Sequence, residues 1–167
     1  RRGMDLYFER HAGDAATIED FLACFTDATG EDLSQFALWY SQAGTPQIAA
    51  RGEFDAKTRR YRLTLAQSTP ATPGQPIKRP MQIPIRFGLI GPNGEDLAFA
   101  SASGARVEGD VIHLTSASQT VTFEGVSARP VPSLLRGFSA PVRLAIDASA
   151  EDLVFQVRAD RDPFNRW

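Results

Sequence analysis

Residues 83–89 read IPIRFGL and decide the fold class, because large apolar side chains occupy every second position. A period of two is typical of a β-strand with one buried face and one solvated face. Residues 61–65 repeat this alternation as YRLTL, and three more segments continue it at 111–115, 119–123 and 142–146. We therefore expect sheets that each have a dry face and a wet face.

Turn residues separate these strands. They cluster at 55–57, 70–76, 91–94, 109–110 and 130–132. Six or seven strands between such turns, over about a hundred residues, are typical of an antiparallel β-sandwich. Proline cannot donate a hydrogen bond to a strand ladder, so Pro84 predicts a sheet edge or a bulge at that point.

Residues 1–45 show a different pattern of apolar residues, which predicts helices. The first helix carries apolar side chains at three- and four-residue spacing and ends near Gly13. Thr17 and Asp20 are suited to a capping box, so we expect a second helix to begin there. Gly30 suits the end of that helix.

Two further helical segments are expected on either side of the strands. Asp32 suits the cap of a third helix that ends before Pro46, with an apolar stripe of Leu33, Phe36, Trp39 and Tyr40. Ser149 suits the cap of a later helix, although the apolar run that follows it could also form a last strand. Asp162 followed by Pro163 predicts one more helix start, and we expect that helix to continue past residue 167.

These patterns assign the fold class α+β and divide the chain into three parts. Residues 1–45 are helical, residues 46–148 form the antiparallel sandwich, and residues 149–167 return to helix. The texture changes at Pro46, where helical spacing gives way to short alternating runs.

Charge and hydropathy exclude several classes of partner. The formal net charge is −2 and the sequence pI is about 5.7, so neither a nucleic acid nor a membrane surface is an expected partner. No apolar run approaches the ~20 residues that a membrane span needs. The N-terminal stretch also lacks the apolar core of a signal peptide, so we expect a cytoplasmic protein.

The residue types that most often carry chemistry are scarce in this sequence. The two histidines, His11 and His113, are far apart, and the single cysteine is Cys24. We expect His11 at the C-terminal end of a helix, His113 exposed on a strand, and Cys24 buried in a helical core. His113 has no acidic neighbour close in sequence, which argues against a catalytic role.

Two other clusters are candidates for a site. Four hydroxyl residues lie near His113 in the sequence, namely Ser101, Ser103, Thr115 and Ser116. The sequence contains no G-x-S-x-G nucleophile elbow, so we assign none of them as a nucleophile. A basic cluster comprises Lys57, Arg59, Arg60 and Arg62. We interpret it as a hairpin turn with solvated charges, and an anion site is the alternative.

Five stretches of the sequence are distinctive. They are LYFERHAGDAATIEDF (6–21), DLSQFALWYSQAGTP (32–46), LTLAQSTPATPGQP (63–76), RPVPSLLRGFSAPVRL (129–144) and DPFNRW (162–167). Together they resemble bacterial aminopeptidase N, the alanyl aminopeptidase family of the gluzincin zinc metallopeptidases. The resemblance runs through nearly the whole chain.

The resemblance implies a place within a larger enzyme. It puts residues 1–45 at the end of a zinc-peptidase catalytic domain, residues 46–148 on an immunoglobulin-like β-sandwich, and residues 149–167 at the start of a C-terminal helical domain. The family's chemistry uses an H-E-x-x-H helix that binds zinc and a G-x-M-E-N strand that grips the substrate amine. Neither motif occurs in this sequence. We therefore assign no catalytic, cofactor-binding or metal-binding residue, and we expect zinc and peptide substrate only in the parent enzyme.

These observations lead to one hypothesis and two alternatives. We expect a non-catalytic segment of a zinc aminopeptidase, inactive alone, whose partners are the remaining domains and whose sandwich bridges the catalytic and helical domains. A self-standing β-sandwich that binds a ligand of its own is the first alternative. A small hydrolase with an unrecognised site is the second, and the scarcity of histidine argues against it.

Overall fold

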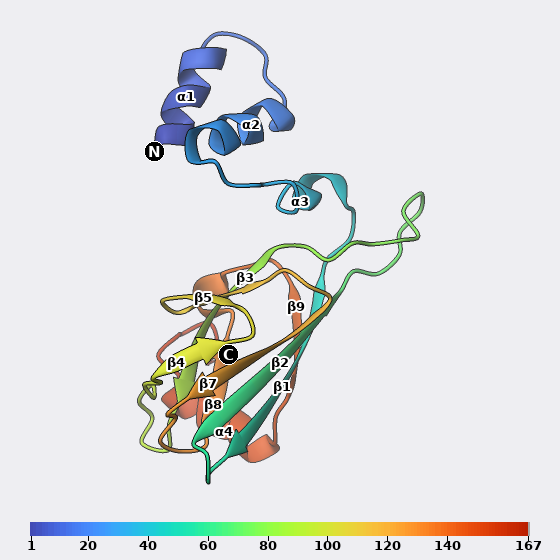
Figure 1. The fold of residues 1–167 in the computed structure, drawn as a ribbon. Helices are drawn as coiled ribbons and strands as arrows, with labels where there is room; N and C mark the ends of the chain where they lie inside the picture. The colour runs from blue at the N-terminus through green and yellow to red at the C-terminus, as the bar shows by residue number, and fades with distance from the viewer. Residues whose placement is uncertain (167) are drawn as a thin grey trace.

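The computed structural model describes residues 1–166, which form two β-sheets packed face to face with helices toward both ends of the chain (Figure 1). The elements run in the order α1 Arg2–His11, α2 Ile18–Thr29, α3 Leu38–Ser41, β1 Gln47–Asp55, β2 Arg60–Ser68, β3 Ile83–Ile90, β4 Ser101–Ser103, β5 Arg106–Glu108, β6 Val111–Leu114, β7 Ser118–Glu124, β8 Val131–Leu134, η1 Arg136–Phe138, β9 Arg143–Asp147 and α4 Ala150–Ala159.

The strands form a five-stranded sheet in the order β4-β7-β2-β1-β9 and a four-stranded sheet in the order β5-β6-β3-β8. Every named pair is antiparallel except β1 with β9, which is parallel. The predicted α+β fold with an antiparallel, immunoglobulin-like sandwich is therefore confirmed, with one parallel pair at a sheet edge.

The core lies between the two sheets. Alternate side chains of β2 (Tyr61, Leu63 and Leu65) point inward and are at most 2% exposed, and Ile83 and Ile85 of β3 are fully buried opposite them. Each fully buried aliphatic side chain contributes about 1.5–3 kcal/mol. A one-residue register slip would move all of them into water, so this alternation fixes the register. The expectation of one dry and one wet face per sheet is confirmed for β2.

Two prolines lie at strand positions that have a neighbouring strand on one side only, and the predicted sheet edge at Pro84 holds only locally. Residues 130–132 were expected to form a turn, but Val131–Leu134 is strand β8, and its edge position accommodates Pro132. Pro84 lies on β3, which is central in its sheet, yet it pairs only with β6 at that point. On the other side, the Ser139 hydroxyl donates to the Pro84 carbonyl at 3.0 Å.

Helices α1 and α2 form a hairpin that stands apart from the sandwich (Figure 1). The predicted capping box is confirmed, because the Asp20 N–H donates to Thr17 Oγ1 and the Thr17 N–H donates to Asp20 Oδ2. Gly30 ends α2 with a φ of 74°, a left-handed conformation that favours glycine. The predicted helix end at this residue is confirmed.

The third predicted helix is much shorter than expected. Only α3, Leu38–Ser41, is regular, and a hydrogen-bonded turn over 34–37 precedes it. Tertiary contacts explain the difference, because Leu38 inserts into the sandwich core while the Gln35 and Trp39 side chains bond to the backbone of another segment. Tertiary packing often overrides local helix propensity in this way.

The segment after the last strand is helical, so the alternative of a further strand there is wrong. The Ser149 side chain caps α4 by accepting from the Asp152 N–H. Asp162 then caps a turn over 163–166 by accepting from the N–H groups of Phe164 and Asn165. The expected continuation past this turn lies outside the described residues. Within residues 1–166, no helix has the length and apolar character to cross a membrane.

Candidate functional site

The chemically versatile side chains lie on different elements. His11 ends α1, Cys24 is on α2 and His113 is on β6. Cys24 is fully buried, as predicted. Over the part of the chain that the structure describes, no group of three or more His, Cys, Asp or Glu side chains could hold a metal ion. These residues do not fit the zinc site of a peptidase.

His113 departs from its predicted environment. Its side chain is only 17% exposed, and Nε2 lies 3.3 Å from Glu108 Oε2. The expectation that His113 is exposed was therefore wrong, since its side chain is mostly buried. Its acidic neighbour, Glu108, lies five residues earlier in the sequence and was not recognised there. Glu108 lies on β5, the antiparallel partner of β6, so the contact depends on strand register.

The four hydroxyl residues near His113 in sequence do not form a site with it. Ser101 and Ser103 lie on β4, in the opposite sheet from His113. The N–H groups of Thr115 and Ser116 both donate to Gln119 Oε1, at 2.7 and 3.1 Å. The structure therefore brings no predicted nucleophile and base together among these residues.

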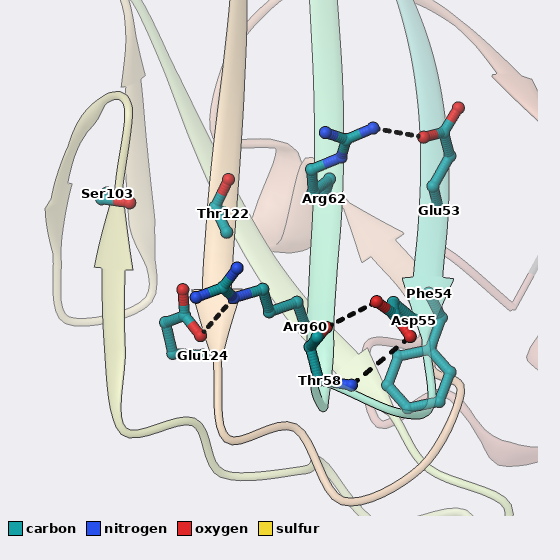
Figure 2. A pocket seen from close by; sticks show the side chains of 9 residues that line it. All are labelled: Glu53, Phe54, Asp55, Thr58, Arg60, Arg62, Ser103, Thr122 and Glu124. Atoms are coloured by element: carbon teal, nitrogen blue, oxygen red, sulfur yellow. Dashed lines mark hydrogen bonds and ion pairs between the residues drawn. The ribbon is translucent and has the colours of Figure 1, made fainter.

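The basic cluster borders an open groove of about 580 Å³ on the outer face of the five-stranded sheet (Figure 2). The two arginines that line the groove are already paired, Arg60 with Glu124 and Arg62 with Glu53, each at 2.9 Å. The hydrogen bond from Arg62 holds the pKa of Glu53 below its ordinary value. These exposed contacts agree with the interpretation as solvated charges, and they neutralise the two arginines that line the groove.

A more unusual arrangement lies between α3 and the sandwich, where side chains hydrogen-bond the backbone of residues 79–82. Gln42 donates to the Arg79 carbonyl and accepts from the Arg79 N–H, at 3.0 and 2.8 Å. Gln35 donates to the Pro80 carbonyl, and Trp39 Nε1 donates to the Gln82 carbonyl at 2.9 Å. We call Gln35, Trp39 and Gln42, with the backbone they bind, the N-side joint.

Two neighbouring side chains extend the N-side joint. From the sandwich, the buried Gln67 makes the same paired bonds to the N–H and carbonyl of Met81, both at 2.8 Å. The Lys78 ammonium donates three bonds, to the Ala43 carbonyl, Thr72 Oγ1 and Gln75 Oε1. Buried polar groups must be hydrogen-bonded to avoid a desolvation cost, and these bonds satisfy a backbone that no strand pairs.

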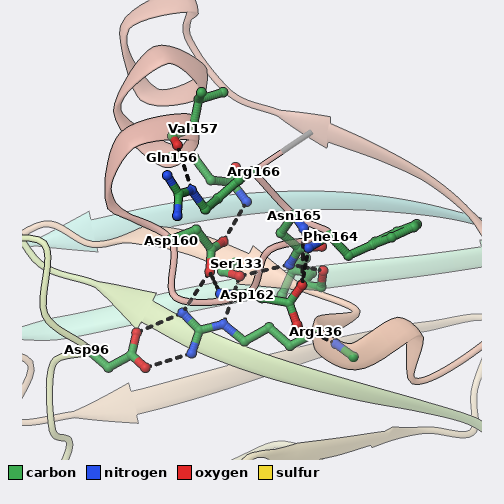
Figure 3. Close-up of polar contacts among 12 residues, drawn as sticks. Asp96, Ser133, Arg136, Gln156, Val157, Asp160, Asp162, Phe164, Asn165 and Arg166 are labelled. Atoms are coloured by element: carbon green, nitrogen blue, oxygen red, sulfur yellow. Dashed lines mark hydrogen bonds and ion pairs between the residues drawn. The ribbon is translucent and has the colours of Figure 1, made fainter.

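A second polar network joins the segment around α4 to the sandwich (Figure 3). Its centre is Arg136, whose side chain is 12% exposed. Arg136 binds Asp96 through two bonds of 2.6 and 2.8 Å and donates to Ser133 Oγ at 2.8 Å. It also lies 3.4 Å from Asp160, a carboxylate with no exposed surface. The hydrogen bond to Asp96, opposed by partial burial, raises the pKa of Arg136.

The last described residues complete this network. Asn165 Nδ2 donates to Ser133 Oγ and to the Leu134 carbonyl, at 2.9 and 2.8 Å. Asp162 Oδ2 accepts from the Gly137 N–H at 2.6 Å. Burial would raise the pKa of Asp162, but the N–H donors, led by Gly137, lower it on balance. We call Asp96, Ser133, Arg136, Asp160, Asp162 and Asn165 the C-side joint.

The sequence alone did not identify either joint. Their bonds connect residues far apart in the chain, such as Gln42 with Arg79 and Asp96 with Arg136, and no local pattern marks such pairs. The one available signal was the Asp162 cap, which now contributes to the C-side joint.

Comparisons with known proteins agree with this architecture. The family described as "Domain of unknown function (DUF3458) Ig-like fold" matches residues 44–147. The whole chain is 42% identical to a segment of aminopeptidase N of Escherichia coli (strain K12) and 46% identical to a segment of aminopeptidase N of Caulobacter vibrioides, covering 19% and 18% of those proteins. The predicted resemblance to bacterial aminopeptidase N is confirmed.

A solved structure supports the same relationship in three dimensions. The crystal structure of Legionella pneumophila aminopeptidase A in complex with aspartic acid matches 98% of this chain with a TM-score of 0.79 at 28% identity. The match covers 17% of that protein. The chain thus spans less than a fifth of the length of these relatives.

Proposed function

Because the chain belongs to the DUF3458 family of Ig-like domains, we propose that it is a non-catalytic, positioning segment of a zinc-dependent aminopeptidase. In this proposal the sandwich holds a preceding catalytic domain and a following helical domain at a fixed separation and angle. Its contribution to peptide hydrolysis is geometric, because small displacements of groups around an active site cost large factors in rate.

The observation that carries the proposal is the pair of joints. Figure 1 shows α3 at one end of the sandwich and α4 toward the other. The N-side joint fixes the segment before β1, and the C-side joint fixes the segment after β9. A linker that only tethered two domains would not need specific side-chain hydrogen bonds to the sandwich at both of its attachments.

The properties of the whole enzyme are part of the same proposal. Its zinc ion and its peptide substrate would bind to residues outside this segment, and its other domains are the proposed partners. The domain limits 1–45, 46–148 and 149–167 and the cytoplasmic location also remain proposals. The family match over residues 44–147 supports the limits of the sandwich.

The alternative of a self-standing binding module has less support. Its best candidate surface is the groove beside the basic cluster, and the arginines there are paired with carboxylates. No described residue lining the groove offers an unpaired buried polar group for a ligand.

Two experiments test the proposal. First, the isolated chain is incubated with alanyl p-nitroanilide and zinc, and we expect neither turnover nor stoichiometric zinc binding. Second, Gln42→Ala is placed in the intact enzyme beside the control Arg62→Ala, which alters an exposed ion pair.

In the intact enzyme, Gln42→Ala should lower kcat/KM by ten- to about a hundredfold at unchanged zinc content, while Arg62→Ala should not. Turnover by the isolated chain would refute the non-catalytic assignment. A folded, zinc-loaded Gln42→Ala enzyme with the activity of the wild type would refute the positioning role.

A further inference from the structure

A small cavity lies between the five-stranded sheet and the start of α4. It has a volume of about 30 Å³, and its walls include Gly52, Tyr61, Arg129, Pro130 and Asp152. A buried site needs roughly 10–15 Å³ to hold a water molecule. The cavity therefore has room for water but not for a metabolite or a peptide side chain.

The cavity contains a buried polar atom with no partner. Tyr61 is 2% exposed, and its hydroxyl makes no hydrogen bond to any residue in 1–166. Buried polar atoms in native proteins nearly always have a partner, either a protein group or an ordered water. Burial raises the pKa of the Tyr61 phenol, so the group is neutral and its O–H can donate.

The other side of the cavity provides acceptors and donors. Arg129 binds Asp152 through two bonds, of 2.8 and 2.7 Å, and the Asp152 side chain is only 13% exposed. These bonds use two of about four lone-pair sites on the carboxylate and two of the five guanidinium N–H groups. Both side chains therefore keep capacity for a further hydrogen bond.

We propose that this cavity binds one ordered water molecule, which links the Tyr61 hydroxyl to the ion pair of Arg129 and Asp152. The water connects β2 in the sandwich core with the first turn of α4. Gly52 makes the arrangement possible, because a Cβ at that position would overlap the Tyr61 hydroxyl. The inference does not depend on the proposed aminopeptidase role.

The site is tested with the full chain in two measurements. A high-resolution crystal structure should show density within hydrogen-bond distance of Tyr61 Oη and of the Asp152 carboxylate, and Tyr61→Phe should lose it. Equilibrium unfolding should show that Tyr61→Phe raises the ratio of unfolded to folded protein by roughly two- to tenfold, the usual effect of one hydrogen bond. The control is Tyr40→Phe, at a tyrosine that is 53% exposed, and it should leave that ratio unchanged.

The sign of the stability change shows whether the Tyr61 hydroxyl is hydrogen-bonded to a water molecule or has no partner. If the hydroxyl is truly unpaired, its removal relieves a desolvation penalty, and Tyr61→Phe should be as stable as the wild type or more so. That result, or an empty cavity in the crystal structure, would overturn the proposal.

Discussion

Arg136→Met should destabilise the chain far more than the loss of an ordinary surface arginine. Methionine keeps much of the side-chain volume but removes the charge and all the donors. Asp160, which has no exposed surface, would then lose its neighbouring cation. Removing one partner of a buried ion pair typically costs 3–5 kcal/mol, because the other charge stays buried and uncompensated.

The structure places the expected cost near the lower end of that range. Asp160 keeps two donors, the Gln156 amide at 3.1 Å and the Asp162 N–H at 3.0 Å. Asp96 is 35% exposed and can be rehydrated, so its lost bonds add about 1 kcal/mol or less. We expect a total of about 3–4 kcal/mol, a large share of the 5–15 kcal/mol typical of a folded domain.

Urea denaturation followed by far-UV circular dichroism measures this difference directly. The matched control is Arg62→Met, which removes a partner of Glu53 from a side chain that is 60% exposed and should cost about 1 kcal/mol or less. Adding Asp160→Asn to Arg136→Met should recover part of the loss, because it removes the uncompensated charge. If Arg136→Met and Arg62→Met cost the same, the C-side joint does not stabilise the fold in the way described.

Two further predictions concern Gly52 and Asp152. Gly52→Ala should cost about 1–3 kcal/mol in urea denaturation, because its Cβ would overlap Tyr61, and a variant as stable as the wild type would contradict this packing. Acidification should also weaken the fold, since the hydrogen bond from Arg129 keeps the pKa of Asp152 below its ordinary value. A carboxyl group with a lowered folded-state pKa stabilises above its unfolded pKa of about 3.9, and that stability is lost as the pH falls through the folded pKa. Thermal midpoints measured from pH 7 to pH 2.5 should therefore fall less steeply for Asp152→Asn than for the wild type, and parallel curves would refute the assignment.

The parts of the fold that the sequence could predict are those marked by local patterns of residues. The alternation along β2 and β3 follows from burial of one face, and it identified both strands. The capping box at Thr17 needs only residues three apart, so it was also predictable. The two capping residues lie close together at the start of one helix, and the alternation in the strands follows directly from which side chains are buried.

The wrong predictions concern contacts between elements. His113 is close to Glu108 because of the register between β5 and β6, which the sequence does not specify. Strand β8 was missed because prolines lie on both sides of Val131 and indicated a turn. They are tolerated in a strand here because β8 is at the edge of its sheet. The short α3 depends on side chains that bond to a segment about forty residues away, as the pair Trp39 and Gln82 shows.

The distribution of polar groups distinguishes a positioning domain from a binding domain. The exposed ion pairs on the outer sheet face, such as Arg60 with Glu124, contribute little to stability and cannot define a geometry. The buried Asp160, in contrast, lies beside Arg136, where the segment around α4 meets the sandwich. The buried Gln67 holds the Met81 backbone, next to the residues that the N-side joint binds. Buried hydrogen bonds are costly when broken, so they resist small displacements of the segments they hold. A domain built to bind a ligand would place such groups around a pocket, so their position beside the attachments supports the proposed positioning role.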